Sequence, residues 1–522
     1  MTTVILFVCL LISSSLGAHS GSEFAQLRTG SLLRTTMMSA ARNPLSSGGA
    51  KSEKLDNFRF LDNGIIRLGI DLSRGGTIGW LGPSSNKSFS LLNVHDFGRV
   101  VQGSFYSGPN PYNPGGKCSE PGGWGRPWPW NPIGAGDVYF NPAPILNLSV
   151  TDERSAVVFT QPMQWACDAV PCDCIFEQRI TLLGSAAQVN LTMHTNRNDT
   201  TFYPGQTQEL PAVYVIGDFC NLWMYNGSTP FTGAPLSQQP AVWGANAWGS
   251  FTTGERWMAF TNGSGWGVGV VSPTVAHFGA GFFNDGKVGV YNCTPKGLGP
   301  YDSPTGYIAP WGSEIIDPRA PFSYQFALVL GDLSEIRGYA AAQYAESRDL
   351  PLVPYYDFAA TGTRVHCVYE DAVDEGLPPR ESDGGLAMVF TGSHPSIWGP
   401  SSVFSPQDAL TIKVNASYHA SLAGSTAALW WISYTGDAAA DSQPCPACVS
   451  TLQVPTADGE FHEMSFDLSA LPSYTSLSAV TRIIFQPLGA APVDPSVLNK
   501  HLFVLSSIKS CSEKNKEKHT SI

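Results

Sequence analysis

The sequence predicts an all-β protein, with a large antiparallel β-structure followed by a smaller β-sandwich or jelly roll. Short runs rich in β-branched and aromatic residues follow one another along the chain, separated by Gly, Pro, Asn and Asp. The 522 residues include 53 Gly and 39 Pro with no short period, which favours a turn-rich fold and excludes collagen. Hydrophobic residues make up 43% of the chain, which is enough for a sizeable core and excludes general disorder.

The larger domain is predicted over residues 55–348. Its strand-like runs include residues 64–70, 156–159, 188–192, 266–271 and 324–330. Repeated strands with turn signals between them indicate antiparallel sheets. One helix is predicted from Leu333 to about Ser347, with Ser334 as its N-cap. Residues 305–311 are interpreted as a loop whose aromatic side chains either extend a sugar platform or belong to the core.

The smaller domain is predicted over residues 362–511, after a Pro-containing linker at 349–361. Strand-like runs occur at residues 386–390, 408–414, 428–433, 462–468 and 481–486. About eight strands in roughly 150 residues fit a jelly roll or β-sandwich. The polar residues 512–522 are expected to form a disordered tail.

The N-terminus predicts secretion to the extracellular space. The apolar run 4–12 is too short to span a bilayer and is followed by small residues, so residues 1–18 are interpreted as a signal peptide. Residues 19–54 are rich in Ser, Gly, Thr and Arg, which predicts a flexible leader. No later apolar stretch is long enough to predict a membrane span.

The cysteines predict disulfides within each half of the chain. Without Cys9, six cysteines lie between residues 118 and 293 and four between 367 and 511. Cys367 and Cys511 are expected to staple the C-terminal domain. The pairs at 172/174 and 445/448 are interpreted as local structural disulfides, because no second CxxC or His pair points to zinc.

Glycosylation is expected from eight Asn-x-Ser/Thr sequons, and each used site must lie on the surface. They begin at Asn86, Asn147, Asn190, Asn198, Asn226, Asn262, Asn292 and Asn415. The net charge of −12 argues against a partner with a phosphate backbone, so no nucleic acid is expected.

Two neighbouring segments combine polar and aromatic side chains in a way that is typical of sugar binding. The first, residues 93–109, carries His95, Asp96, Arg99, Gln102 and Tyr106. The second, residues 124–137, carries Trp124, Trp128, Trp130, Asn131 and Asp137. Aromatic faces pack on pyranose rings, while amides and carboxylates bind the hydroxyls. The alternative is that these Trp residues only pack a long loop onto the sheets.

A third cluster, residues 206–214, supplies Gln208, Glu209 and Tyr214 ahead of a strand-like run. Glycoside hydrolysis needs two carboxyl groups beside the bond, so we expect Glu209 to act with Asp137 or Asp96. The simplest alternative for Asp96 is an ion pair with Arg99.

The same residues support two other functions. Uronate β-elimination needs a carboxylate neutraliser and a base such as Tyr or His, and His95, Arg99, Gln102, Tyr106, Asn131 and Tyr214 fit those roles. A lectin would use the same aromatics without any reaction. No cofactor is expected, apart from a structural calcium ion that Asp71, Asp285 or Asp302 could hold.

Three runs carry a resemblance to known proteins: LDNGIIRLGIDLSRGGTIGW at 61–80, NVHDFGR at 93–99 and QGSFY at 102–106. They resemble a group of secreted proteins that is similar to the galactose-mutarotase-like supersandwich of carbohydrate-active enzymes. The resemblance covers about residues 55–345 and implies a supersandwich fold, without assigning catalytic positions. Lyases of that fold usually add a helical toroid, which nothing in this sequence predicts, so the resemblance favours a hydrolase.

The second domain is similar in its strand layout and in Trp398, Trp430 and Trp431 to galactose-binding-like carbohydrate-binding modules. The sequence therefore predicts a secreted enzyme that cleaves a polysaccharide. A lyase or a lectin remains the alternative.

Overall fold

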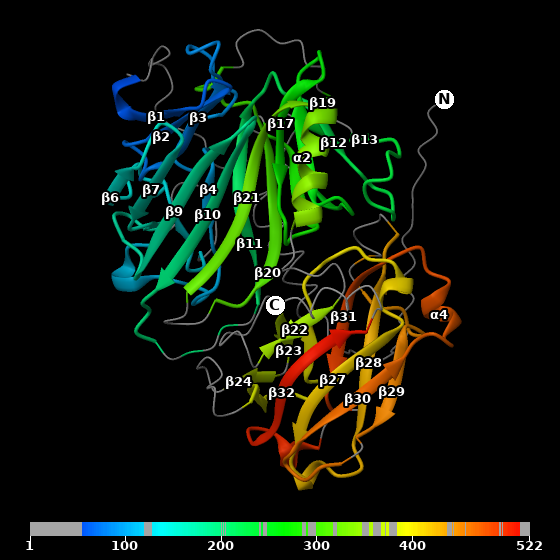
Figure 1. Cartoon of the computed structure of the whole chain (residues 1–522). Helices are drawn as coiled ribbons and strands as arrows, with labels where there is room; N and C mark the ends of the chain where they lie inside the picture. Colours follow the sequence, from blue (N-terminus) through cyan, green and yellow to red (C-terminus); the bar gives the residue numbers. More distant parts are fainter. Residues whose placement is uncertain are drawn as a thin grey trace, which may run out of the picture.

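The computed structural model describes residues 55–118, 128–199, 201, 203, 205–239, 242–243, 248–283, 289–290, 299–316, 321–346, 354–358, 367–370, 372–374, 384–435, 441, 443–454, 456–489, 492 and 494–511. The expected signal peptide, leader and C-terminal tail lie outside these residues, as does most of the expected linker. The described chain is nearly all β, which confirms the predicted fold class (Figure 1).

The N-terminal part contains three antiparallel assemblies. The small sheet consists of β1 (Phe58–Asp62), β2 (Ile66–Asp71) and β3 (Thr77–Pro83). Sheet I has the order β13 (Ser237–Gln239), β12 (Asn221–Met224), β16 (Trp257–Thr261), β17 (Trp266–Val271), β21 (Pro321–Asp332), β10 (Ala186–Thr195), β9 (Cys174–Leu183), β7 (Ser155–Thr160) and β6 (Ile145–Val150).

Sheet II lies behind sheet I in the view of Figure 1. Its order is β19 (Gly289–Val290), β14 (Val242–Trp243), β18 (His277–Phe283), β20 (Thr305–Glu314), β11 (Gln206–Ile216), β4 (Gln102–Ser104), β5 (Pro132–Ile133) and β8 (Met163–Gln164), and β15 (Trp248–Thr252) pairs with β18. The segment 305–311, interpreted from the sequence as a loop, is therefore the start of a central strand.

The two large sheets pack face to face because side chains alternate between the faces of each strand. Val189 and Leu191 of β10 meet Val213 and Val215 of β11 in one continuous apolar core. Each sheet consequently keeps an outer face, and these two faces point to opposite sides of the sandwich.

Helix α2 (Leu333–Glu346) confirms the predicted helix and packs on β16, β17 and β21 at the outer face of sheet I (Figure 1). Its N-cap lies two positions before Ser334, the residue that the sequence predicted as the cap. Asp332 Oδ1 accepts hydrogen bonds from the amides of Ser334 and Glu335, and Glu335 Oε2 accepts one from the Asp332 amide. This reciprocal pair is a capping box, so the N-cap is Asp332 and not Ser334.

Two further sheets form the C-terminal part. Sheet III consists of β24 (Ala372–Asp374), β25 (Leu386–Phe390), β32 (His501–Ser510), β27 (Thr411–Tyr418) and β30 (Phe461–Asp467), with β22 (Tyr355–Asp357) paired to β32. Sheet IV consists of β23 (Val368–Glu370), β26 (Ser396–Trp398), β31 (Val480–Gln486), β28 (Thr426–Ser433) and β29 (Val449–Gln453). The short helices of the described chain are α4 (Pro472–Thr475) and the 3₁₀ turns Leu55–Asn57, Pro114–Gly116, Pro406–Asp408, Ala420–Leu422 and Pro495–Val497.

The aromatics of the C-terminal part are mostly inside it. Trp431 lies fully buried in the core between sheets III and IV, so it cannot serve as a sugar platform. Trp398 is buried on the other face of sheet IV, and Trp430 beside it is half-buried. The structure thus leaves Trp430 as the most accessible of the three Trp residues on which the likeness to carbohydrate-binding modules rests.

The two parts touch through a small apolar cluster in which Ala276 meets Val403, Tyr434 and Ala479. The Tyr434 hydroxyl also lies 3.1 Å from the carbonyl oxygens of both Asn226 and Thr252. Because Thr252 belongs to β15 and Ala276 directly precedes β18, the C-terminal part adjoins one end of sheet II.

The cysteines follow the sequence prediction in part. Disulfides join Cys118 to Cys167, Cys172 to Cys174 and Cys445 to Cys448, so both local pairs are confirmed. The expected Cys367–Cys511 staple is wrong, because both residues are free thiols and Cys367 is buried.

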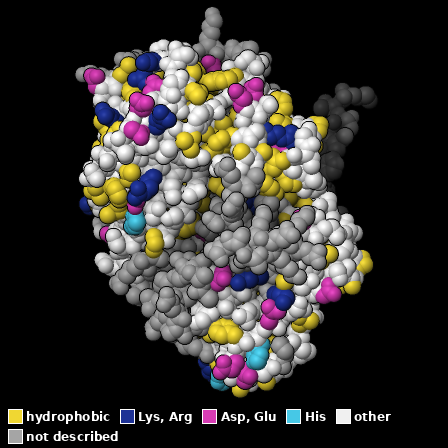
Figure 2. Space-filling model, viewed as in Figure 1, with side chains coloured by type: hydrophobic (Ala, Val, Ile, Leu, Met, Phe, Trp, Pro, Cys, Tyr) yellow, Lys and Arg dark blue, Asp and Glu magenta, His cyan; other side chains and the backbone are white. Residues whose placement is uncertain are grey.

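No helix of the described chain is long and apolar enough to cross a membrane. Acidic and basic side chains are interspersed on the face shown in Figure 2, so the net negative charge is not gathered there into one patch.

Candidate functional site

The outer face of sheet II brings two of the three predicted segments together. Glu209 of β11 pairs with Ser104 of β4 on one side and with Trp311 of β20 on the other. Directly paired residues project from the same face of a sheet, so these three side chains share the outer face. The sequence predicted Glu209 ahead of a strand. In the structure it lies inside the strand β11.

The Glu209 carboxylate is almost completely buried, with 2% of the residue exposed, and phenol hydroxyls hydrogen-bond to it. Tyr106 donates to Oε2 over 3.3 Å, and Tyr307 donates to Oε1. Trp311 Nε1 donates to the Tyr307 hydroxyl over 3.1 Å, and Ser104 Oγ donates to the Tyr106 hydroxyl over 3.2 Å. We call these five residues the Glu209 cluster.

Local backbone features position this cluster. The register of β11 shifts between Glu209 and Val213 against β20, which is a β-bulge, and bulges re-aim side chains. The Trp311 ring lies directly on Gly279 of β18, where a Cβ would sit 2.0 Å from the ring. Only glycine therefore allows Trp311 its present position.

Tyr214 extends the aromatic lining of this face. Its ring centroid is 5.1 Å from that of Tyr307, and both rings are buried. Trp311 and Tyr106 are half-buried, so they are the rings of this group that a ligand can reach. A carboxylate beside reachable aromatic faces is the combination that a sugar site requires.

His277 adjoins the cluster and was missed by sequence reasoning. Its ring centroid is 6.0 Å from that of Trp311, Nε2 is 3.0 Å from Ser250 Oγ, and Nδ1 is 3.3 Å from Thr252 Oγ1. Burial lowers the pKa of His277 to about 4, and the Arg482 cation of β31 lowers it further in the same direction. A lone His between Ala276 and Phe278 gives no sequence signal, because only the fold brings it to Trp311.

Three predicted substrate-binding amides instead form hydrogen bonds within the protein, mostly between strands and the loops beside them. Gln102 accepts from the Ala135 amide and donates to the carbonyls of Phe97 and Gly98. Asn131 accepts from Trp128 Nε1 and donates to Ser104 Oγ and to a backbone carbonyl.

Gln208 is the third of these amides. It accepts from the Tyr106 amide and donates to Ser107 Oγ. All three side chains are buried with both amide ends in use, so they hold the site's framework and do not face a ligand.

Asp137 is also a framework residue. Its Oδ1 accepts from the amides of Tyr139 and Asn141, and its Oδ2 accepts from Asn141 Nδ2 and from the Ala169 amide. The residue is 0% exposed and both oxygens accept two hydrogen bonds. The geometry therefore gives Asp137 a loop-organising role, in place of the acid or base role expected from the sequence.

His95, Asp96 and Arg99 form a separate anchor between two loops. Asp96 accepts from the Arg99 amide over 3.0 Å and pairs with Arg99 Nε over 3.5 Å, which is the simple alternative that the sequence offered. Arg99 Nη1 reaches the Ser303 carbonyl, and His95 Nδ1 lies 2.7 Å from the Tyr301 carbonyl. Neither Asp96 nor Asp137 thus makes a described contact with the Glu209 cluster.

Trp128 and Trp130 of the second segment are buried and do not form an open sugar platform. Trp130 belongs to the core between sheets I and II, and Trp128 packs against Ala166, Tyr106 and Trp165 with 6% of its surface exposed. Trp124 lies outside the described residues. The alternative interpretation, in which these rings pack a long loop, therefore holds for Trp128 and Trp130.

Among the described residues, no group of three or more His, Cys, Asp or Glu side chains could hold a metal ion. Asp71 is paired with Arg74 over 2.7 Å, Asp302 accepts from the Gly299 amide, and Asp285 lies outside the described residues.

Comparison with known proteins gives similarity in fold. No family model matches the chain, and no curated protein matches its sequence. Among solved structures, a galactose mutarotase related enzyme from Lactobacillus acidophilus is 12% identical over 52% of this chain and 97% of its own, with a TM-score of 0.32.

A galactose mutarotase-like protein from Lactobacillus casei is 10% identical over 52% of this chain and 99% of its own, with a TM-score of 0.32. The alpha-galactosidase from Lactobacillus brevis is 9% identical over 53% of this chain and 39% of its own, with a TM-score of 0.30.

Proposed function

We propose that the chain is a carbohydrate-active enzyme whose reaction takes place on the outer face of sheet II, with Glu209 as its proton-transferring group. The observation that carries the proposal is a buried carboxylate that receives hydrogen bonds from Tyr106 and Tyr307, next to half-buried aromatic rings. Phenols bring no compensating charge, so a carboxylate held by them can still exchange a proton with a sugar oxygen.

We further propose hydrolysis of a glycosidic bond as the reaction. The second group that hydrolysis needs is the Tyr106 phenol, because Asp137 and Asp96 are engaged elsewhere. Glu209 would take the proton of Tyr106 as the phenol oxygen attacks the anomeric carbon, while the glycosidic C1–O bond breaks with its electron pair and the protonated Glu209 passes that proton to the leaving oxygen. Water, deprotonated by Glu209, would then displace the phenol oxygen from the anomeric carbon, and Tyr106 would regain its proton from Glu209. Secretion is part of this proposal, and the disulfides at 118/167 and 172/174 support an oxidising compartment.

Sugar binding without reaction is the second candidate. It is favoured by the deep burial of Glu209, which restricts how closely a glycosidic oxygen can approach. In that case the half-buried faces of Trp311 and Tyr106 would hold the sugar and Glu209 would only orient the rings.

One experiment separates these outcomes. The full chain is incubated with a panel of algal, plant and animal polysaccharides, and reducing ends and the absorbance of unsaturated uronate are both recorded. New reducing ends without that absorbance support hydrolysis, both signals indicate β-elimination, and retained binding with neither signal indicates a lectin.

The matched variants are Glu209→Gln and Asp96→Asn. Glu209→Gln should lose about a thousandfold in rate because its amide cannot exchange the proton. Asp96→Asn should keep the wild-type rate, since Asp96 only pairs with Arg99. Full activity in Glu209→Gln would remove Glu209 from the mechanism.

A further inference from the structure

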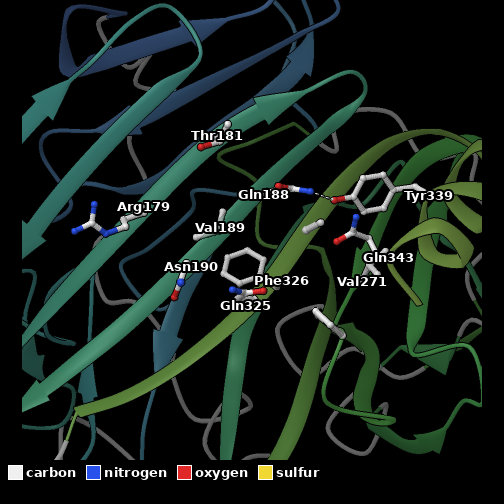
Figure 3. Close-up of a pocket in the computed structure, with 12 residues that line it drawn as sticks. Arg179, Thr181, Gln188, Val189, Asn190, Val271, Gln325, Phe326, Tyr339 and Gln343 are labelled. Atoms are coloured by element: carbon white, nitrogen blue, oxygen red, sulfur yellow. Dashed lines mark hydrogen bonds between the residues drawn. The ribbon is translucent and has the colours of Figure 1, made fainter. Parts of the chain in front are cut away.

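A hollow lies on the opposite side of the sandwich from the Glu209 cluster. It opens on the outer face of sheet I, between β9, β10, β21 and helix α2, and has a volume of ≈ 180 Å³ (Figure 3). Its polar lining includes Arg179, Gln188, Asn190, Gln325, Tyr339 and Gln343. The volume has room for a single sugar ring and not for a polysaccharide chain.

The lining presents several amide groups to one small space. Asn190 of β10 is flanked across the sheet by Arg179 of β9 and by Gln325 of β21. Gln188 lies two residues before Asn190 on the same face, and its Nε2 donates to the Tyr339 hydroxyl over 2.8 Å. Such amides and hydroxyls bind the hydroxyl and acetamido groups of sugars.

Asn190 is also the first residue of the sequon Asn190-Leu191-Thr192. Alternation along β10 buries Leu191 in the core and leaves Asn190 and Thr192 on the outer face. Thr192 Oγ1 lies 2.8 Å from Ser323 Oγ at an exposed position. The sequon is therefore presented on the surface, with its acceptor residue inside the hollow.

The orientation of the Asn190 amide suits attachment of a sugar. Its Oδ1 is buried without a hydrogen-bond partner in the described structure, whereas its Nδ2 is neither buried nor hydrogen-bonded there. Figure 3 shows Asn190 beside Gln325, its pairing partner on the neighbouring strand β21. Nδ2 is the atom to which an N-linked glycan is joined.

We propose that Asn190 carries an N-linked glycan whose first N-acetylglucosamine ring lies in this hollow, against Gln188 and Gln325. The donor is an oligosaccharide on a lipid pyrophosphate, supplied in the secretory pathway that the N-terminus predicts. A bond forms between the sugar C1 and Nδ2, the C1–O bond to the lipid pyrophosphate breaks with its electron pair, and the amide proton leaves to solvent.

Asn86 provides the contrast within the same chain. It lies in an exposed turn, and its Oδ1 accepts from the amide and hydroxyl of Ser88. Asn86 is exposed and is not among the residues that line the hollow. A glycan at Asn86 would extend into solvent, while one at Asn190 would rest on the sheet.

The test uses the full chain with its own N-terminus, secreted from a glycosylating eukaryotic host, and maps the glycopeptides by mass spectrometry. Asn190 should be occupied. Peptide N-glycosidase should release its glycan from the native protein at least about tenfold more slowly than from the denatured protein, because the ring must first leave the hollow. The glycan at Asn86 should be released at similar rates in both states.

Two variants test the seating itself. Gln325→Ala removes one wall at an exposed position and should speed native release at Asn190, and Gln188→Ala should do the same from the other side. An unoccupied Asn190, or equal release rates in native and denatured protein, would overturn the proposal. Thr192→Val removes the sequon and lies on the other sheet from the Glu209 cluster. A failure of the glycan proposal therefore leaves the proposed enzymatic function untouched.

Discussion

Glu209 and Asp137 are two equally buried carboxylates in different surroundings. Side-chain phenols from Tyr106 and Tyr307 reach Glu209, whereas Asp137 is held by three backbone amides and by Asn141 Nδ2. A carboxylate whose lone pairs are taken by backbone amides organises a loop, because its hydrogen bonds cannot open without unfolding that loop. Burial alone therefore does not identify a catalytic acid. The chemical nature of its hydrogen-bond partners distinguishes a catalytic carboxylate from a structural one.

The largest effect is expected from a change at Asp137, and it is a loss of stability. Asp137→Asn places an amide donor where Asn141 Nδ2 or the Ala169 amide donates. We expect the free energy of unfolding to fall by about 4 kcal/mol, because buried donors lose a charged acceptor. Urea unfolding measures this loss. A change below about 1 kcal/mol would show that the four hydrogen bonds do not organise the loop.

The next largest effect is expected at the Glu209 cluster, and it is a loss of reaction rate. Tyr106→Phe removes the hydroxyl that donates to Glu209 Oε2 and leaves the half-buried ring in place. The rate on the preferred polysaccharide should fall about a hundredfold, with little change in stability. Steady-state kinetics measures the rate, and Tyr139→Phe, near Asp137, is the matched control. Equal rates in Tyr106→Phe and wild type would exclude the phenol from the reaction.

A third effect concerns pH at the edge of the cluster. The pKa of His277 is about 4 in the folded chain and about 6.5 when unfolded, so the unfolded state binds a proton first as pH falls. Stability is therefore complete above about pH 6.5 and decreases by about 2 kcal/mol towards pH 4. Ser250, Thr252, Trp311 and Arg482 surround the ring and define its environment.

Urea unfolding at pH 7 and pH 4.5 measures this dependence in wild type and in His277→Gln. The variant keeps a polar side chain that cannot be protonated in this range. Its loss of stability on acidification should be smaller than that of wild type. An identical loss in both proteins would mean that His277 titrates normally.

The smallest effect concerns a neutral hydrogen bond between the two parts of the chain, in contrast to the charged acceptor Asp137. Tyr434→Phe removes the hydroxyl that lies between the Asn226 and Thr252 carbonyls. A neutral donor to a backbone carbonyl contributes about 1 kcal/mol, against the larger loss expected at Asp137. Thermal unfolding should therefore show a small drop in Tm for this variant. A loss as large as that of Asp137→Asn would show that the contact between the two parts stabilises the whole chain.

Much of the secondary structure could be predicted from the sequence. The runs 266–271 and 386–390 coincide with β17 and β25, and the helix begins at the predicted Leu333. The ends and type of these elements depend on the local hydrophobic pattern and on flanking Gly and Pro residues, and both are visible in the sequence. Strand 305–314 was missed because its Gly306 and Pro310 suggest a loop.

The site could be predicted only in part. The sequence identifies Glu209 and Tyr106 as candidates. Their proximity to Tyr307 and Trp311 cannot be predicted, because it depends on which strands pair and in which register. Residues 208–216 of β11 are buried on both faces, so no alternation shows which side chains face outward. For the same reason Trp130, which looks like a sugar platform in sequence, turns out to be core.

The most direct test of the account is a crystal structure of the Glu209→Gln variant with a bound oligosaccharide from the panel. The account predicts a sugar ring on the outer face of sheet II, stacked on Trp311 or Tyr106, with an oxygen within hydrogen-bonding distance of residue 209. A sugar bound instead to the loop of residues 128–141, with the Glu209 cluster unoccupied, would contradict it.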